Sequence, residues 1–219
     1  MLKQGLLITF EGIDGSGKST VINALNQKLH EYFLKNNLSI DLIQTREPGG
    51  YNNLLAEKIR DLILDKNYQM PDITEALLFA ASRSAHVELT IKPALIQKKI
   101  VLCDRFLDSS IVYQGYVKKL GKRLIAKINK CATNKISPDI IFYFKIDPSL
   151  AQKRMNNDNR SNNRIDNMEE KFHQNVALYY EKHFAHKSNV VKIDASSTIE
   201  TIIDKCLDKI ITYIKTKYE

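Results

Sequence analysis

The 219-residue chain has little of the residues that mark several large classes of protein. Its three cysteines, Cys103, Cys131 and Cys206, are scattered and form no Cys-x-x-Cys pair, which excludes a disulfide scaffold and a structural zinc site and fits a reducing cytosol. With only eight glycines and five prolines, the composition is neither fibrous nor disordered. No window approaches about 18 uncharged apolar residues, so we expect no membrane span. The first residues contain no secretory signal, and we expect a cytoplasmic protein.

The composition and length of the chain predict one compact domain over residues 1–219, because 43 % of the residues are apolar and the length allows a sizeable core. Lysine and arginine outnumber aspartate and glutamate by 33 to 25, which gives a formal net charge of +8. Such a surplus fits phosphorylated small substrates as well as nucleic acid. No basic run alternates with aromatic residues, so we expect no nucleic-acid partner.

Short apolar runs rich in β-branched residues alternate with longer segments of helical periodicity. The expected strands are 5–10, 40–45, 100–103, 139–146 and 190–194. The expected helices are 18–36, 52–64, 73–97, 108–116, 123–133, 166–184 and 197–217. This alternation predicts a three-layer α/β fold, in which helices flank a parallel five-stranded sheet that is buried on both faces. Sheets of this type bind ligands at the carboxyl ends of their strands, so the polar residues that follow each strand are the candidate site.

The segment from Gly12 to Ser19 matches the GxxxxGK[ST] motif in the required strand–loop–helix setting. Its glycines let successive backbone N–H groups turn toward phosphate oxygens, and the helix that begins near Lys18 directs its positive end at the same anion. Lys18 can reach the β- and γ-phosphates of a nucleotide, and the Ser19 hydroxyl can ligate Mg²⁺. The residues expected to bind the nucleotide are Gly12, Ile13, Asp14, Gly15, Ser16, Gly17, Lys18, Ser19 and Thr20. The motif by itself is shared by kinases, GTPases, ATPases and translocases.

Charged residues also follow the second and third expected strands. Arg46 and Glu47 remain at the tip of the second strand because Pro48 halts it, although this pattern alone fits any turn. Asp104 and Arg105 follow the third strand, where a carboxylate suits the shell of a Mg²⁺ ion and a guanidinium suits a phosphate. A surface ion pair or a helix N-cap explains Asp104 and Arg105 equally well.

A possible base site lies on the third expected helix, where Phe79 and Arg83 are four residues apart and share a face. An aromatic ring beside a planar donor can hold a nucleobase by stacking and hydrogen bonding. An aromatic residue on a helix more often belongs to the core, but the nearby arginine in an otherwise apolar stretch weakens that interpretation.

The segment 156–164 has no apolar side chain and cannot bury itself, which predicts a mobile loop between two helices. Arg154 precedes it, Arg160 lies within it and Arg164 ends it. The variable positions of the phosphate loop contain no cation, so charge on the transferring phosphoryl group has to be neutralised from elsewhere. We therefore expect an Arg/Asn-rich lid at about 148–166 that closes over ATP, excludes water and supplies the arginines.

Taken together, these motifs resemble those of the bacterial thymidylate kinases. They are FEGIDGSGKST at 10–20, REPGG at 46–50, LLFAASR at 77–83, DRFLDSS at 104–110, YQG at 113–115 and NRID at 163–166. Their order and spacing agree from the first strand to the lid, so the resemblance covers most of the chain. It implies a P-loop kinase that uses ATP and Mg²⁺ to convert dTMP to dTDP in dTTP synthesis. Members of the family are usually homodimers.

The resemblance also implies roles for single residues. At the acceptor, Phe79 would stack on thymine, Arg83 and Gln114 would hydrogen-bond or line the base, Arg60 and Arg105 would contact the phosphate, Ser110 would line the site, and Glu47 would lie near the sugar and metal. The metal would be held by Ser19 and Asp104, and the catalytic set would be Lys18, Asp104, Arg105, Arg160 and Arg164. Two positions depart from common family patterns. Phe106 stands where tyrosine is common, and Gly15 stands where one branch of the family has arginine; the lid fits the other branch, which supplies its arginine from there.

The chemistry needs no general base if the acceptor is a phosphate, whose second pKa is about 6. Two other functions stay open from the sequence. A deoxynucleoside kinase would need a base such as Glu47 for a sugar hydroxyl, but nucleosides have no phosphate for Arg60 and Arg105. A P-loop ATPase that switches a nucleic acid or protein usually has further binding surface, for which 219 residues leave little room.

Overall fold

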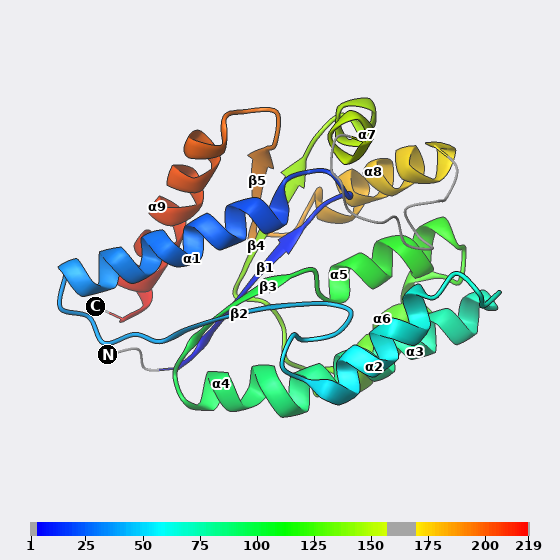
Figure 1. Cartoon of the computed structure of the whole chain (residues 1–219), viewed down its shortest axis with the longest axis horizontal. Helices are drawn as coiled ribbons and strands as arrows, with labels where there is room; N and C mark the ends of the chain where they lie inside the picture. Colours follow the sequence, from blue (N-terminus) through cyan, green and yellow to red (C-terminus); the bar gives the residue numbers. More distant parts are fainter. Residues whose placement is uncertain (1–3, 157–169, 219) are drawn as a thin grey trace.

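The computed structural model describes residues 4–156 and 170–218. Its sheet has five strands in the order β2-β3-β1-β4-β5, and all neighbouring strands are parallel (Figure 1). The strands are β1 (Leu6–Glu11), β2 (Leu42–Arg46), β3 (Ile100–Asp104), β4 (Ile140–Lys145) and β5 (Val190–Asp194). The five-stranded parallel sheet expected from the sequence is confirmed.

Helices cover both faces of this sheet. They are α1 (Lys18–Lys35), α2 (Leu54–Leu64), α3 (Asp72–His86), α4 (Lys92–Ile96), α5 (Leu107–Ser110), α6 (Lys122–Ala132), α7 (Pro148–Asn156), α8 (Glu170–Phe184) and α9 (Ile199–Tyr218), with π-helical segments η1 (Val87–Ile91) and η2 (Ile111–Val117). In Figure 1, α1 and α9 lie side by side on one side of the sheet and α4 lies on the opposite side. None of the helices in the described ranges is long and apolar enough to cross a membrane.

The central strands are buried on both faces, as their uninterrupted apolar runs predict. On β1, Leu6 and Ile8 belong to the cluster that includes the apolar side chains of α1 and α9. Leu7 lies between them in sequence and packs with Val87 and Ile91 of η1 on the other face. Because the strands are parallel and in register, the residues after β1, β2 and β3 meet at one edge of the sheet.

The helix expected over 73–97 is present as a continuous helical segment over 72–96, but its middle part is π-helical and not α-helical. The chain leaves α3 at His86, passes through the π-helical η1 and continues as α4. Pro93 lies in the first turn of α4, and it has no N–H with which to continue α-helical hydrogen bonding from the preceding turn. The wider turn before it accommodates this loss, and the N–H of Lys92 bonds the carbonyl of Val87. The helix expected over 108–116 likewise becomes π-helical from Ile111 onward.

The range expected for the lid, 148–166, begins with a helix for which the sequence analysis gave no bounds. Residues 148–156 form α7, and the carboxylate of Asp147 accepts the N–H of Ser149 at 2.8 Å. Pro148 is the first helical residue, so an acidic cap followed by proline gave a local signal for this start. The remainder of the expected lid, with Arg160 and Arg164, lies outside the described residues, and the lid stays a prediction.

Candidate active site

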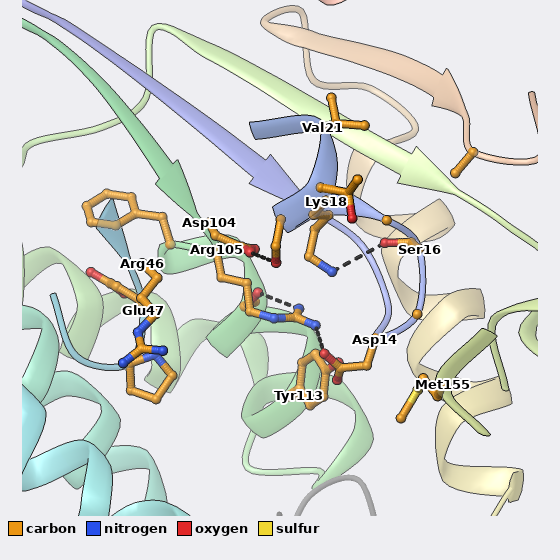
Figure 2. Close-up of a pocket in the computed structure, with 18 of the residues that line it drawn as sticks. Asp14, Ser16, Lys18, Val21, Arg46, Glu47, Asp104, Arg105, Tyr113 and Met155 are labelled. Atoms are coloured by element: carbon orange, nitrogen blue, oxygen red, sulfur yellow. Dashed lines mark hydrogen bonds and ion pairs between the residues drawn. The ribbon is translucent and has the colours of Figure 1, made fainter. Parts of the chain in front are cut away.

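The phosphate loop connects β1 to α1 at the carboxyl edge of the sheet. Gly12, Gly15 and Gly17 have φ angles of 147, 76 and 85°, which side chains rarely adopt. The buried Lys18 folds back into the loop, where its Nζ donates to the carbonyls of Gly12 and Ile13 at 3.1 and 2.9 Å. It also donates to Ser16 Oγ at 3.3 Å (Figure 2). Burial, together with the positive charge of Arg105, lowers the pKa of Lys18 to about 8. A nucleotide phosphate would supply the negative charge that this buried ammonium lacks.

The loop forms one wall of a pocket of about 800 Å³. Figure 2 shows the loop on one side of the pocket, Arg46 and Glu47 on the other, and Arg105 between them. The pocket brings together most of the residues expected at the site: Asp14, Gly15, Ser16, Gly17, Lys18, Ser19, Thr20, Glu47, Arg60, Phe79, Arg83, Asp104, Arg105, Ser110 and Gln114. Gly12 and Ile13 are not among the lining residues, but their carbonyls bind Lys18. Arg160 and Arg164 are in the part of the chain that the structure does not describe.

Ser19 and Asp104, the expected metal ligands, are in contact. Ser19 Oγ donates to Asp104 Oδ2 at 2.7 Å. The other carboxylate oxygen, Oδ1, is buried and has no hydrogen-bond partner in the structure. Hydroxyl and carboxylate oxygens are the donors that Mg²⁺ prefers, so this pair fits the ion. Within residues 4–156 and 170–218 there is no group of three or more His, Cys, Asp or Glu side chains that could hold a metal by itself, so waters and phosphate oxygens would complete the shell.

Arg105 spans the gap between the phosphate loop and α8. Its Nη2 donates to Asp14 Oδ1 at 2.8 Å, and its Nη1 donates to Ser109 Oγ at 3.2 Å and Tyr180 Oη at 3.1 Å. The residue adopts a φ of 66°, which is uncommon for a side chain of this size. Its backbone N–H bonds the carbonyl of Phe10 at 2.9 Å, which fixes this turn to the end of β1. The guanidinium is thereby held at the middle of the pocket.

Glu11 is a site residue that sequence reasoning missed. The buried carboxylate accepts from the N–H of Phe106 at 2.8 Å, from Ser109 Oγ at 2.6 Å and from Tyr180 Oη at 3.1 Å. Ser109 and Tyr180 also bond the guanidinium of Arg105, so Glu11 helps to position Arg105 through these two hydroxyl groups. Burial, with the charge of Asp108 nearby, raises the pKa of Glu11 from its ordinary value of 4.5 to about 7.

This raised pKa predicts a pH-dependent stability that Glu11→Gln should remove. The folded chain keeps a proton that the unfolded chain releases between pH 4.5 and about 7, so folding is progressively disfavoured as the pH rises through that range. The free energy of unfolding of the wild type should therefore fall, relative to Glu11→Gln, by up to about 3 kcal/mol. Urea unfolding of both proteins across this pH range measures the difference, and parallel pH profiles would contradict the prediction.

Arg83 is buried and lines the pocket, and its contacts come from several elements. Its Nε donates to Glu47 Oε2 at 2.7 Å, its Nη1 to Asn129 Oδ1 at 2.7 Å and its Nη2 to Ser110 Oγ at 3.0 Å. The second oxygen of Glu47 contacts His86 Nδ1 at 3.2 Å. Glu47, expected near the sugar and metal, thus also fixes the orientation of Arg83. His86, Asn129 and this buried network are further features that the sequence did not reveal.

Two more arginines lie where β2 ends. Arg60 donates to the carbonyl of Pro48 at 2.7 Å, and burial, together with Arg46, lowers the pKa of Arg60. Arg46 pairs with Glu57 at 2.8 Å and lies over the ring of Tyr51. Both arginines line the pocket, so its acceptor side carries concentrated positive charge.

Helix α7 lies against the phosphate loop at Gly15. A Cβ atom at this glycine would lie 2.3 Å from the carbonyl oxygen of Ala151 and 2.9 Å from Met155 Cγ. The arginine found here in one branch of the family resembled above would therefore displace α7 in this chain. Arg154, which also lies on α7, lines the pocket and donates to the carbonyl of Ala195 at 2.9 Å.

Gly15→Ala should destabilise the chain more than Gly17→Ala, which is a matched control. Both glycines have positive φ, at 76 and 85°, but a Cβ at Gly17 meets nothing within 4 Å. The backbone strain of about 1 kcal/mol is common to both variants, whereas the collision with Ala151 adds at least about 1 kcal/mol to the first. Thermal unfolding without nucleotide compares them. Equal melting temperatures would show that α7 is not held against the loop.

A phosphate loop that shares one pocket with a cluster of arginines is typical of P-loop kinases, in which a nucleotide meets a second anionic substrate. The comparison with known families agrees with this class. The family model for thymidylate kinase matches residues 10–206. The chain belongs to the thymidylate kinase family.

Individual relatives cover nearly the whole chain. A thymidylate kinase of Finegoldia magna is 45 % identical over 204 residues, which cover 93 % of this chain and 96 % of the relative. A thymidylate kinase of Latilactobacillus sakei is 40 % identical and covers 94 % of each chain. One of Ligilactobacillus salivarius is 39 % identical and covers 93 % of this chain and 96 % of the relative. The resemblance noted from the motifs is confirmed, and the chain is a kinase.

Proposed function

We propose that this kinase transfers the γ-phosphoryl group of ATP to dTMP, giving dTDP for dTTP synthesis. The observation that carries the proposal is a pocket in which the phosphate loop faces Arg46 and Glu47, with Arg105 between them, and which Arg83 also lines. The family to which the chain belongs, and relatives named thymidylate kinase, support the choice of acceptor.

On the donor side, backbone N–H groups of the loop and the amino end of α1 would bind the phosphates of ATP. Lys18 would exchange its loop carbonyls for the β- and γ-phosphates. Ser19 and Asp104 would hold Mg²⁺, which neutralises phosphate charge when bound. The contact between these two side chains and the unpartnered Asp104 Oδ1 support this assignment.

On the acceptor side, Arg105 and Arg60 would bind the phosphate of dTMP. Phe79 would stack on the thymine ring, with Arg83 and Gln114 at its edge and Ser110 beside them. The attacking phosphate oxygen is already mostly deprotonated near neutral pH, since its second pKa is about 6. The protein therefore has to align two anions and neutralise the charge between them, which the arginines and Lys18 are suited to do.

The alternative of a deoxynucleoside kinase is not favoured. It would need Glu47 as a general base, but Glu47 is buried and its two oxygens contact Arg83 and His86. Both oxygens are therefore already engaged by side chains of the protein, and neither is free to take a proton from a sugar hydroxyl. The family assignment also disfavours an ATPase switch.

A coupled assay of ADP release tests the function. The acceptors are dTMP, dUMP, dCMP, dAMP, dGMP and thymidine, each with ATP and Mg²⁺, and the assay without acceptor measures background hydrolysis. We expect dTMP to give the highest kcat/KM. Faster turnover with thymidine, or hydrolysis stimulated by DNA and not by dTMP, would overturn the proposal.

A homodimer is a further part of the proposal. Helices α2 and α3 pack together and expose the apolar side chains Leu54, Leu55, Leu62, Ile73 and Leu77. Such a group of exposed apolar residues is suited to a second copy of the chain. The cytoplasmic location and catalysis by Arg160 and Arg164 also stay predictions.

Leu77→Glu should convert the dimer to a monomer, because it places a charge in the apolar contact. Leu34→Glu is the control, since Leu34 on α1 is more exposed, at 77 % against 53 % for Leu77, and lies on another helix. Sedimentation velocity at several concentrations measures the result. Dimerisation of Leu77→Glu equal to that of the wild type would contradict this choice of surface.

A further inference from the structure

A buried carboxylate on α3 holds the side-chain amide of Gln114. Glu75 is only 1 % exposed, and its Oε1 accepts from Gln114 Nε2 at 2.9 Å. Its Oε2 accepts from Lys118 Nζ at 2.8 Å. Lys118 also pairs with the half-exposed Asp72 at 2.9 Å. Each oxygen of Glu75 therefore has its own donor.

This contact fixes which end of the Gln114 amide is available to a ligand. A carboxylate can only accept hydrogen bonds, so the NH₂ end of Gln114 has to face Glu75. The ammonium of Lys118 lies against the second oxygen of Glu75, so both carboxylate oxygens act as hydrogen-bond acceptors. Gln114 lines the pocket, and no donor in the described ranges bonds its Oε1. The amide therefore has a carbonyl oxygen, and not an NH₂ group, to offer the pocket.

We propose that Glu75 is a specificity-determining positioning residue, which acts through Gln114 to select pyrimidine bases that carry a hydrogen on N3. The inference rests on the proposed function and deepens it. Thymine and uracil have an N3–H that donates to the Gln114 oxygen. Neutral cytosine has a lone pair at N3, which would face that oxygen with no hydrogen between them. Two acceptors brought together in a buried site repel each other and stay unpaired, which disfavours cytosine.

Glu75→Gln tests this mechanism because Lys118 determines how the new amide is oriented. Lys118 can only donate, so it would bind the oxygen of the introduced amide and leave its NH₂ end facing Gln114. Gln114 would then turn its own oxygen toward that NH₂ and its NH₂ toward the pocket. The pocket would present a donor, which matches the N3 of cytosine and opposes the N3–H of thymine.

The measurement is the ratio of kcat/KM for dTMP to that for 5-methyl-dCMP. These two acceptors share the 5-methyl group and differ at positions 3 and 4 of the ring. We expect the ratio to fall about tenfold or more in Glu75→Gln, through loss with dTMP and gain with 5-methyl-dCMP. A ratio within about twofold of the wild-type value in a folded variant would overturn the proposal.

Asp72→Asn is the matched control. It removes the other carboxylate that pairs with Lys118, but Asp72 makes no contact with Gln114. Its ratio should equal that of the wild type, and a fall as large as in Glu75→Gln would show that charge near Lys118, and not the amide orientation, sets the preference. If the wild type does not phosphorylate dTMP, the proposed function fails. If it does and Glu75→Gln retains its ratio, only the role of Glu75 fails.

Nuclear magnetic resonance of the wild-type chain tests the same orientation without relying on the folding of a variant. With ¹⁵N-labelled glutamine, the Gln114 NH₂ signal is the one lost in Gln114→Ala. We expect its protons to be protected from exchange before nucleotide is added, because they already bond Glu75. Binding of dTMP should leave them protected and should also protect the imino proton of thymine. An NH₂ group that becomes protected only when dTMP binds would overturn the proposal.

Discussion

Lys18→Ala should lower kcat by a factor of about 100 or more, which corresponds to about 2.7 kcal/mol of transition-state stabilisation. The ammonium of Lys18 is already inside the phosphate loop, held by the carbonyls of Gly12 and Ile13. Its lowered pKa reflects a buried charge with insufficient negative charge around it, which a phosphoryl group in transfer would supply. Alanine removes that charge without changing the backbone N–H groups of the loop.

Lys28→Ala is the matched control for this experiment. Lys28 lies on the same helix, is 45 % exposed and pairs with Asp204 at 3.4 Å. It should retain wild-type kcat, and circular dichroism should show both variants folded. Steady-state kinetics with ATP and dTMP varied separately measures the effect. A folded Lys18→Ala protein with kcat within about threefold of the wild type would contradict the role of Lys18.

The sheet could be predicted from the sequence because its three central strands, β1, β3 and β4, are almost entirely buried. The apolar residues of β3 and β4 are all buried, and the polar residue that ends each strand marks the edge of the sheet where ligands bind. The exact helical conformation was harder to predict where a backbone constraint, and not only apolar periodicity, determines the hydrogen bonding. At η1, Pro93 forces a wider turn, and a pattern of apolar spacing alone does not reveal this.

The candidate site likewise contains residues that could be predicted from the sequence and residues whose roles only the fold reveals. Residues that the phosphate loop or a strand tip places locally, such as Lys18 and Asp104, could be predicted from motif and context. Glu11 could not be assigned its role, because the hydroxyl of Tyr180 that it binds is 169 residues away along the chain. Glu75 was missed for another reason. In the sequence, Glu75 is indistinguishable from an ordinary acidic residue in the first turn of a helix. Its hydrogen bonds to Gln114 and Lys118 exist only in the folded chain.

Arg105→Lys should lower kcat/KM for dTMP by about 100-fold or more while the KM for ATP changes little. The planar guanidinium reaches Asp14 on one side and Ser109 and Tyr180 on the other, and it still lines the pocket. A single ammonium cannot span these partners and also pair with an acceptor phosphate in two-point geometry. The variant retains the positive charge, so a large loss would result from geometry and not from net charge.

Two further variants test whether Arg105 binds the acceptor phosphate or only joins α8 to the phosphate loop. Tyr180→Phe removes one hydrogen bond to Arg105 and leaves the guanidinium paired with Asp14, so its loss in kcat/KM should be much smaller. Arg123→Lys makes the same exchange at an exposed position on α6 and should retain wild-type kinetics.

Steady-state kinetics with each substrate varied, together with melting temperatures, compares the three variants. If Arg105→Lys and Tyr180→Phe lose equal stability and equal activity, Arg105 acts by joining α8 to the phosphate loop. If Arg105→Lys alone loses activity with dTMP, at a melting temperature similar to that of Tyr180→Phe, the guanidinium acts on the acceptor phosphate, and this is the result that we expect.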